Sequence, residues 1–274
     1  MTADNKIEFS VVVPTYNRAN VLPRALESIL VQSHPAREII VVDDGSSDGT
    51  AVLLRREYPQ VRYHYQRHNG VSAARNLGIR HATARWIAFL DSDDRWHPQK
   101  LHFQAVSISN NPRMRLFHCN EVWLRNDREV TQPKHLCKFG GSIFSQCLNH
   151  CVIAASSAVI RRDVFNDVGF FDESLKACED YDMWLRITAN EPVGFVEEAL
   201  VTRFSGHGDQ LSTTRWLDSY RIRALSKLLA LDVLTFRQRR EANLMLEKRR
   251  NIVQRGIQKR RRDQRVEKRT HSTP

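Results

Sequence analysis

The first half of the chain alternates short, largely apolar runs with segments in which apolar residues recur every three or four positions. The short runs predict buried strands, and the recurrence of three or four predicts amphipathic helices. Strands that alternate with helices predict an α/β fold, with a mostly parallel sheet flanked by helices on both faces. The predicted strands of this half are residues 9–13, 38–42, 61–65 and 86–90.

Cap and turn residues indicate where the helices of this half begin. Asn20 is a candidate N-cap for the first helix, and Pro23 is tolerated in the first turn that follows. Ser72 is a candidate N-cap for a later helix, after the Asn-Gly turn at 69–70. We expect Pro14 to end the first strand.

The pattern is less regular in the second half, where we predict short strands, one helix that carries Met183, Trp184 and Ile187, and a long helix near the end. The predicted strands are 116–122, 157–160 and 193–201, and the long helix covers 216–236. We therefore expect three parts: an α/β catalytic domain over residues 1–212, a helical extension over 213–247, and a basic, partly disordered tail over 248–274.

The positive charge of the chain is concentrated in that tail. The formal net charge is +11, and the segment from Lys248 to Arg269 holds 11 Lys or Arg against 2 Asp or Glu. The rest of the chain is therefore nearly neutral, which makes nucleic acid the less favoured partner. Sparse apolar positions give the tail a weakly amphipathic pattern, which is typical of a helix that contacts an anionic membrane surface. A solvated charged tail is the alternative.

Cysteine usage and the absence of long apolar runs favour a cytoplasmic protein, either free or bound at the inner face of a membrane. The five cysteines are an odd number at irregular spacing, which is unlike a disulfide framework. Cys147, His150 and Cys151 lack the second ligand pair of a structural zinc site. The N-terminal residues lack the pattern of a secretory signal, and no apolar run reaches the ~18 residues of a membrane span.

The strongest chemical signal is the run Asp91-Ser92-Asp93-Asp94, which follows a buried strand. Three carboxylates at one strand end repel one another unless a cation or a set of hydrogen-bond donors compensates. Mg²⁺ or Mn²⁺ binds one or two protein carboxylates together with phosphate oxygens, so a diphosphate would complete such a site. An acidic turn that caps the following helix is the alternative.

Two other loops should reach the same edge of the sheet, because ligands bind beyond the carboxyl ends of parallel strands. The loop at 43–48 offers Asp44, whose carboxylate can accept hydrogen bonds from a nucleotide base or ribose, although an ordinary Asp-Gly turn is an alternative. The loop at 14–18 supplies an aromatic face and donors. Arg75 can bind diphosphate oxygens in fork geometry, or form a salt bridge on its helix face.

Six segments, taken in order, resemble the successive motifs of family 2 glycosyltransferases with the Rossmann-like GT-A fold. They are Ser10-Val-Val-Val-Pro-Thr-Tyr-Asn17, Val41-Val-Asp-Asp-Gly-Ser-Ser-Asp48, Gly70-Val-Ser-Ala-Ala-Arg-Asn-Leu-Gly78, Phe89-Leu-Asp-Ser-Asp-Asp94, Gly169-Phe-Phe-Asp172 and Glu179-Asp-Tyr-Asp-Met-Trp184. The resemblance spans about residues 9–212, and six ordered motifs make it specific as a set.

The resemblance implies a role for each matching residue. The residues implied to bind the nucleotide sugar are Pro14, Thr15, Tyr16, Asp44, Arg75, Asp91 and Ser92. The metal would be held by Asp93, with Asp91 and His207 as further ligands, and Asp180 corresponds to the catalytic base. The match of His207 rests on a region where insertions are common. By residue type alone, Asp180 also suits a helix cap and His207 a surface loop.

The resemblance therefore predicts a metal-dependent, inverting hexosyltransferase that uses Mn²⁺ or Mg²⁺ and a UDP- or dTDP-linked sugar. The acceptor would be a saccharide or lipid-linked hydroxyl in surface polysaccharide or glycolipid biosynthesis. Nucleotidyl transfer is a rival, but it should show a Gly-rich, basic phosphate loop after the first strand, and residues 13–17 lack one. A basic nucleic-acid or membrane-surface binding protein with a non-catalytic nucleotide-binding domain is the other alternative.

Overall fold

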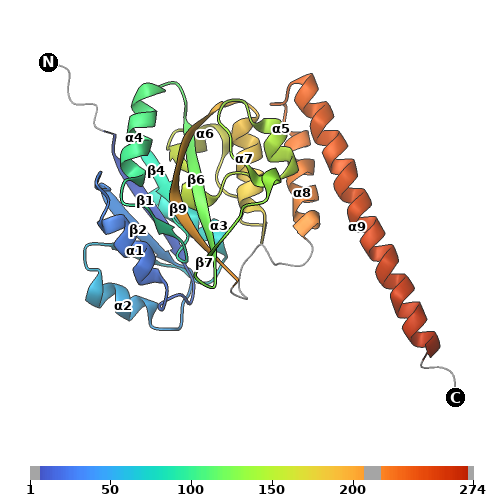
Figure 1. Cartoon of the computed structure of the whole chain (residues 1–274), viewed down its shortest axis with the longest axis horizontal. Coiled ribbons are helices and arrows are strands. Elements are labelled where there is room, and N and C mark those ends of the chain that lie inside the picture. The colour runs from blue at the N-terminus through green and yellow to red at the C-terminus, as the bar shows by residue number, and fades with distance from the viewer. Residues whose placement is uncertain (1–6, 207–216, 271–274) are drawn as a thin grey trace.

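The computed structural model describes residues 7–206 and 217–270, and its first half is the alternation of strands and helices that the pattern predicts (Figure 1). In chain order the elements of this half are β1 (Phe9–Thr15), α1 (Leu22–Leu30), β2 (Glu38–Asp43), α2 (Thr50–Glu57), β3 (Arg62–Tyr65), α3 (Val71–His81), β4 (Trp86–Phe89), β5 (Arg95–Trp96) and α4 (Lys100–Asn110). The predicted strands of this half are confirmed to within two residues.

The second half adds longer strands and most of the helices. Its elements are β6 (Leu116–Arg125), β7 (Arg128–Val130), η1 (Lys134–Leu136), α5 (Phe144–Asn149), η2 (Ala155–Ser157), β8 (Val159–Arg161), α6 (Val164–Val168), α7 (Glu179–Thr188), β9 (Val193–Ser205), α8 (Leu217–Ala230) and α9 (Phe236–Thr270). No helix in the two described ranges is long and apolar enough to cross a membrane.

All strands join one sheet in the order β3-β2-β1-β4-β8-β6-β9-β5, with β7 paired to β6. The strands β3, β2, β1 and β4 are parallel, whereas β8 pairs with β4 and β6 in antiparallel fashion. The register sets Thr15 of β1 opposite Asp43 of β2, so these two strands end at the same level. The loops that follow them therefore start side by side.

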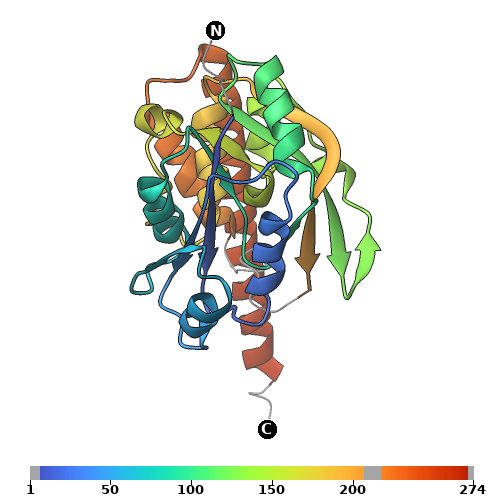
Figure 2. The ribbon, with the colours of Figure 1, turned by 90° about the vertical axis from the view of Figure 1, so that its left-hand side faces the viewer.

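Helices cover both faces of the sheet, and each face has its own apolar core (Figure 2). Val11 and Val13 of β1 pack toward α1 and α4, while Val12 packs toward α3 and the later helices. The alternation of these neighbours follows from the two-residue period of a strand. Gly78 allows α3 to approach closely, because a Cβ at that position would meet Val12 Cγ1 at 2.4 Å.

Three local predictions were wrong. Helix α1 has Val21 as its N-cap residue, without a side-chain cap, because the backbone N–H groups of Val21 and Leu22 donate to the Arg18 carbonyl in a turn. Helix α3 has Gly70 at this position, with φ of 94°, so Ser72 lies inside the first turn. Pro14 does not end its strand, and β1 continues for one more residue. At both helix starts, no side-chain cap forms and the backbone alone makes the turn. At Pro14 the strand continues because the pairing of β1 with β2 runs on through Thr15.

The helix predicted over residues 216–236 is α8, which ends earlier, at Ala230, and a second helix, α9, begins at Phe236 after residues 231–235. Helix α9 packs its first turns against α8 and α5 and then extends away from the body of the protein (Figure 1). It continues without a break across residue 248, where we placed the start of the tail. The basic segment is helical through Thr270.

Candidate active site

The carboxyl ends of β1, β2 and β4 bring the three predicted loops together at one edge of the sheet. The Asp44 N–H donates to the Thr15 carbonyl at 2.8 Å, which joins the loops after β2 and β1. The Leu90 N–H donates to the Val12 carbonyl at 3.1 Å, which brings the loop after β4 alongside them. This edge is where an open α/β sheet binds its ligands.

Asp44 organises the loop that leads into α3. Its buried carboxylate accepts hydrogen bonds from the backbone N–H groups of Asn69 at 2.9 Å and Gly70 at 2.8 Å, and from the Gln66 amide at 2.6 Å. His68 Nδ1 lies 2.8 Å from the same carboxylate. Both Asp44 oxygens are therefore engaged by the protein itself, and a contact with the nucleotide base stays a prediction.

Tyr16 presents the aromatic surface that the sequence led us to expect. Its ring is exposed and stacks on the His68 imidazole, with ring centroids 4.1 Å apart and planes inclined by 26°. Pro14 and Thr15 are buried beneath it, and Thr15 Oγ1 has no hydrogen-bond partner among the described residues. Asn17 ties this loop to the next one, because its Oδ1 accepts from the Ser47 N–H at 2.8 Å. The stacked pair forms a flat platform that suits a nucleotide base.

The four residues of the acidic run have different environments. The side chains of Asp91 and Asp93 are 31% and 21% exposed, whereas that of Asp94 is 5% exposed and Ser92 is buried. Ser156 joins two of them, because its Oγ accepts from the Asp91 N–H at 3.1 Å and donates to Asp94 Oδ2 at 2.6 Å. Burial raises the pKa of Asp94 to about 8. Of these four side chains, those of Asp91 and Asp93 are therefore the partly exposed ones, and Asp93 forms an ion pair with Arg18 at 3.1 Å.

Arg75 bridges the acidic run and α7. Its Nη2 donates to Asp91 Oδ1 at 2.8 Å, and its Nη1 donates to Glu179 Oε1 at 2.7 Å. The guanidinium is buried, and its Nε has no hydrogen-bond partner in the described part of the chain. Of the two roles that the sequence allowed, this geometry shows the salt bridge, and diphosphate binding stays a prediction.

The first turn of α7 carries three carboxylates with different partners. Glu179 pairs with Arg75, and Asp182 pairs with Arg186 at 2.9 Å. Asp180 accepts hydrogen bonds from its neighbour's backbone, Tyr181 N–H at 2.7 Å, and from the Cys151 thiol at 3.1 Å. It is half-buried and forms no ion pair with the described residues. Asp180 is therefore an ionisable group with only neutral donors, as suits a proton acceptor.

Arg203 on β9 is a cation of this site that we did not identify from the sequence. Its guanidinium lies 3.9 Å from Asp94 and 3.6 Å from Glu121. Burial opposes its charge, but the carboxylates of Glu121, Asp94, Asp91 and Asp180 outweigh burial and raise the pKa of Arg203. No motif marks this residue. Its strand, β9, pairs with β5, which directly follows the acidic run, and with β6, which carries Glu121.

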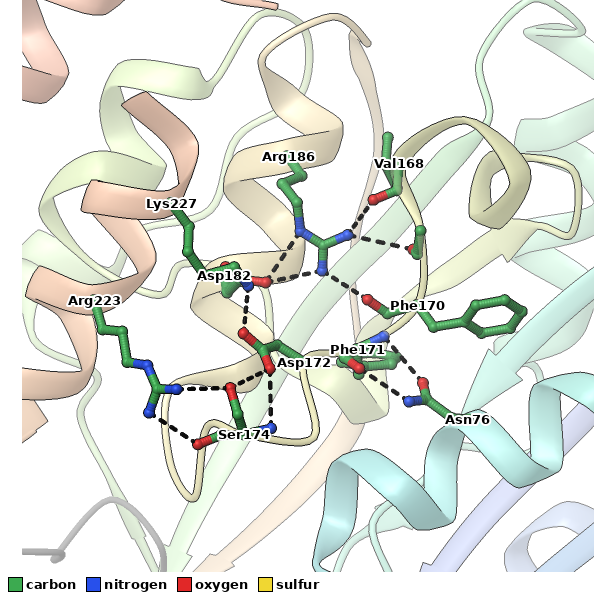
Figure 3. Close-up of polar contacts among 11 residues, drawn as sticks. Asn76, Val168, Phe170, Phe171, Asp172, Ser174, Asp182, Arg186, Arg223 and Lys227 are labelled. Atoms are coloured by element: carbon green, nitrogen blue, oxygen red, sulfur yellow. Dashed lines mark hydrogen bonds and ion pairs between the residues drawn. The ribbon is translucent and has the colours of Figure 1, made fainter. Parts of the chain in front are cut away.

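The loop that precedes α7 is held from three sides (Figure 3). Arg186 of α7 donates to the backbone carbonyls of Val168, Gly169 and Phe170 as well as to Asp182. Asn76 of α3 exchanges two hydrogen bonds with the Phe171 backbone, at 2.9 and 3.0 Å. Lys227 of α8 pairs with Asp172 and, at 3.0 Å, with Asp182. These contacts fix the position of α7 relative to the sheet edge.

The donor set fits a hard divalent cation in part. Asp91 and Asp93 supply two partly exposed carboxylates, which is the number that Mg²⁺ or Mn²⁺ takes from a protein when phosphate oxygens complete its shell. The described residues hold no group of three or more His, Cys, Asp or Glu that could bind a metal by themselves. His207, the third predicted ligand, lies outside the described residues.

Comparisons of the sequence with known proteins agree on one family. The sequence model of glycosyl transferase family 2 matches residues 10–169. A Rickettsia felis protein named as an uncharacterized glycosyltransferase is 32% identical over 206 residues, which are 74% of this chain and 34% of that protein. An uncharacterized glycosyltransferase of Haemophilus influenzae is 29% identical over 181 residues, 65% of this chain and 61% of that protein. This chain thus spans about a third of the Rickettsia felis relative.

Solved structures of one Staphylococcus aureus protein share the fold. The crystal structure of TarS 1–349 in complex with UDP superposes with a TM-score of 0.68 at 22% identity, and the match covers 89% of this chain and 71% of the TarS chain. The complex of the same fragment with UDP-GlcNAc gives a TM-score of 0.68 at 21% identity and covers 89% and 72% of the two chains. The match extends well beyond residue 169, where the family match ends.

Proposed function

Since this chain belongs to glycosyltransferase family 2 and has the GT-A fold, we propose that it transfers a sugar from a nucleoside diphosphate sugar to a hydroxyl acceptor, with inversion at the anomeric carbon. The observation that carries the proposal is Asp180, a half-buried carboxylate that accepts hydrogen bonds from two neutral donors, the Tyr181 N–H and the Cys151 thiol. Asp180 lies on a helix that Arg75 ties to the acidic loop at the sheet edge. This link supports a proposed proton acceptor close to the proposed diphosphate site.

In the proposed reaction, Asp180 takes the proton of the acceptor hydroxyl while the acceptor oxygen bonds to the anomeric carbon. The bond from that carbon to the diphosphate oxygen breaks in the same step, so the sugar inverts and the nucleoside diphosphate leaves. Asp93 and Asp91, with His207, would hold a Mn²⁺ or Mg²⁺ that neutralises charge on the leaving group. Tyr16 would stack on the base, and the loop that Asp44 organises would border it.

For the donor, we favour a UDP-linked sugar over a dTDP-linked one. The support is the fold shared with TarS, which has been crystallised with UDP and with UDP-GlcNAc. A thermal-shift panel of UDP-GlcNAc, UDP-glucose, UDP-galactose, dTDP-glucose and GDP-mannose tests this, each with Mn²⁺ and with EDTA. A ligand present at 100 times its Kd stabilises the folded state by about 2.7 kcal/mol.

The expected result is a higher melting temperature with one or more UDP-sugars, in Mn²⁺ but not in EDTA. Stabilisation by the guanosine donor alone would overturn the donor assignment, and equal stabilisation in EDTA would overturn the metal requirement. Release of UDP with a panel of alkyl glycosides then identifies the acceptor class. A chain that neither binds nor turns over any of these donors would refute glycosyl transfer by this site.

For the acceptor, we propose a lipid-linked or surface saccharide, reached while the basic end of α9 contacts an anionic membrane surface. The support is the concentration of Lys and Arg in a helix that extends away from the body of the protein (Figure 1). Each basic residue near an anionic surface contributes about 1 kcal/mol. We expect the full chain to sediment with phosphatidylglycerol vesicles but not with phosphatidylcholine vesicles.

The matched variant replaces Arg260, Arg261 and Arg262 by Gln and should lose this sedimentation while keeping UDP-sugar binding. Equal recovery with both kinds of vesicle would reject the membrane contact. A gel shift with duplex DNA tests the nucleic-acid alternative. Under that alternative the full chain would bind the DNA, and the variant with Gln at these three positions would not.

A further inference from the structure

Cys151 lies at the point where the chain passes from α5 toward the sheet, directly against the first turn of α7. Its Sγ is 3.1 Å from Asp180 Oδ2 and 3.5 Å from the carbonyl oxygen of Ile153. A thiol has one proton, and an ionised carboxylate is a stronger acceptor than a carbonyl. The nearer and stronger acceptor is Asp180, so the thiol donates to the carboxylate.

This thiol stays a donor over the working range of pH. Burial raises the pKa of Cys151 well above its usual value, and the charge of Asp180 and the hydrogen bond to it raise the pKa further. A protonated thiol is a neutral, weak donor. It therefore fixes the carboxylate without adding a positive charge beside it.

The other two carboxylates in the first turn of α7 are bound by cations rather than by neutral donors. Glu179 is paired with Arg75, and Asp182 with Arg186 and Lys227. A cation at such distances occupies the carboxylate oxygens and compensates their charge, so these two side chains are committed to ion pairs. Asp180, the base of the proposed reaction, is instead oriented by two neutral donors, and Arg203 of β9 acts on it through its charge without an ion pair among the described residues.

We propose that Cys151 is a positioning residue whose thiol orients the Asp180 carboxylate toward the acceptor hydroxyl. The inference rests on the proposed function, because it assigns the thiol a task only if Asp180 accepts the proton. One Asp180 oxygen is held by the Tyr181 N–H and the other by the thiol, so the plane of the carboxylate is defined by two donors from different segments. Loss of the thiol leaves one donor and frees the carboxylate to rotate.

Other ionisable groups also act on this part of the site and must be unchanged in a test. Those that interact with Asp180, Cys151 or their neighbour Cys178 come from α5, α7, α8 and β9. They are Cys147, Glu179, Tyr181, Arg203, Asp218 and Arg221. None of them is altered by a substitution at Cys151.

The first experiment compares Cys151→Ala, Cys151→Ser and Cys147→Ala by UDP release from the UDP-sugar that the panel identifies. Cys147→Ala is the matched control, because it removes a buried thiol from α5 that has no bond to Asp180. We expect Cys151→Ala to lower kcat about 5- to 50-fold, a part of what a general base contributes, with KM for the donor unchanged. The acid limb of its kcat/KM profile should move up by about 0.5 to 1 pH unit, since the ionised carboxylate loses a donor.

Cys151→Ser keeps a donor at the same position and should restore both kcat and the acid limb. Equal losses in the Ala and Ser variants, matched by equal falls in melting temperature, would reduce Cys151 to a packing role. A Cys151→Ala enzyme with the profile of the unmodified enzyme would overturn the proposal outright.

The second experiment needs no turnover and measures alkylation of Cys151 by iodoacetamide at pH 8.5, followed by mass spectrometry. Asp180→Asn removes the negative charge that raises the thiol pKa, so Cys151 should react several-fold faster in that variant, while exposed Cys137 reacts at the same rate in both. An unchanged Cys151 rate would show that the bond does not exist.

The two experiments separate the inference from the function on which it rests. If Asp180→Asn keeps full turnover, Asp180 is not the base. The proposed function then loses its proton acceptor, and the inference about Cys151 fails with it. If Asp180→Asn removes turnover while Cys151→Ala does not, only the inference fails. In an Asp180→Asn background, Cys151→Ala should have no further effect on kcat, because the two residues act as one unit.

Discussion

Arg75 and Glu179 form an ion pair of 2.7 Å in the interior, with side chains that are 4% and 5% exposed. The pair joins α3, which follows the nucleotide-side loops, to the first turn of α7, which carries the proposed base. Arg75 also holds Asp91 of the acidic run. One guanidinium therefore connects the donor side and the acceptor side of the site, and its removal should affect both stability and activity.

Replacement of Arg75 by Met should destabilise the fold by about 3–5 kcal/mol, because two buried or half-buried carboxylates lose their shared cation. Urea unfolding followed by circular dichroism measures this change. Arg37→Met is the control: Arg37 pairs with Glu8 at the surface, where such a pair contributes ~0–1 kcal/mol. If the two variants lost equal stability, the ion pairs of Arg75 would stabilise the fold no more than a surface ion pair does.

Asp180→Asn should lower turnover by about 10²- to 10⁴-fold and leave the affinity for the UDP-sugar unchanged, because the amide cannot accept the proton of the acceptor. Initial rates of UDP release measure the turnover, and calorimetric titration with UDP measures the affinity. Asp172→Asn serves as a comparison, since Asp172 lies in the loop before α7, pairs with Lys227 and has no place in the proposed chemistry. A fall in UDP affinity as large as the fall in turnover would contradict this division of roles.

His118 should make the stability depend on pH. Its ring is fully buried and its Nε2–H donates to the Phe139 carbonyl at 2.8 Å. Burial, with the nearby charge of Lys138, lowers the pKa of His118 to about 3. Between about pH 3 and 6.5 the unfolded chain binds a proton that the folded chain does not, so stability is present above pH 6.5 and is lost as the pH falls.

The expected slope from this residue is at most about 1.4 kcal/mol per pH unit. Urea unfolding between pH 4 and 7 measures it, and His118→Gln, which keeps an N–H donor, should remove its share of the slope. If the unfolding free energy of the variant and of the unmodified protein changed equally with pH, His118 would not contribute to the pH dependence of stability.

Lys227→Met should weaken the contact between α8 and the loop before α7 (Figure 3). Asp182 is buried and would keep only Arg186 as a cation partner, which should cost about 1–3 kcal/mol of stability. We also expect lower turnover, because α7 carries Asp180. Arg223→Met is the matched substitution on the same helix, since Arg223 donates to the neutral Ser174 and forms no ion pair with the described residues. Equal effects of both variants would argue against a specific role for Lys227.

The arrangement of the sheet edge could be predicted from the sequence because it depends on local patterns. Apolar runs indicated β1, β2 and β4, and the polar residues after them had to meet where parallel strands end. Such conclusions need only the spacing of apolar residues along the chain and the direction of the strands.

The partners of the site residues could not be predicted, because they come from distant parts of the sequence. Arg75 is joined to Glu179 across 104 positions, and Cys151 reaches Asp180 only because α5 packs beside α7. Arg203 enters through a parallel pairing of β6 with β9 that includes register shifts near Asn120. Charge and residue type are visible in a sequence, but which charges neutralise one another depends on the packing of helices and strands.

The unbroken course of α9 has a consequence for orientation. Ala242 and Leu246 anchor its first half in the apolar core, and Arg249 binds the Asn149 carbonyl at 2.6 Å. The remaining residues through Thr270 extend the same helix by about 30 Å. A flexible linker of that length would let the catalytic domain tumble freely about its attachment point, but a helix rooted in the core would not. A surface that binds the far end of α9 would therefore set the orientation of the sheet edge and its distance from that surface.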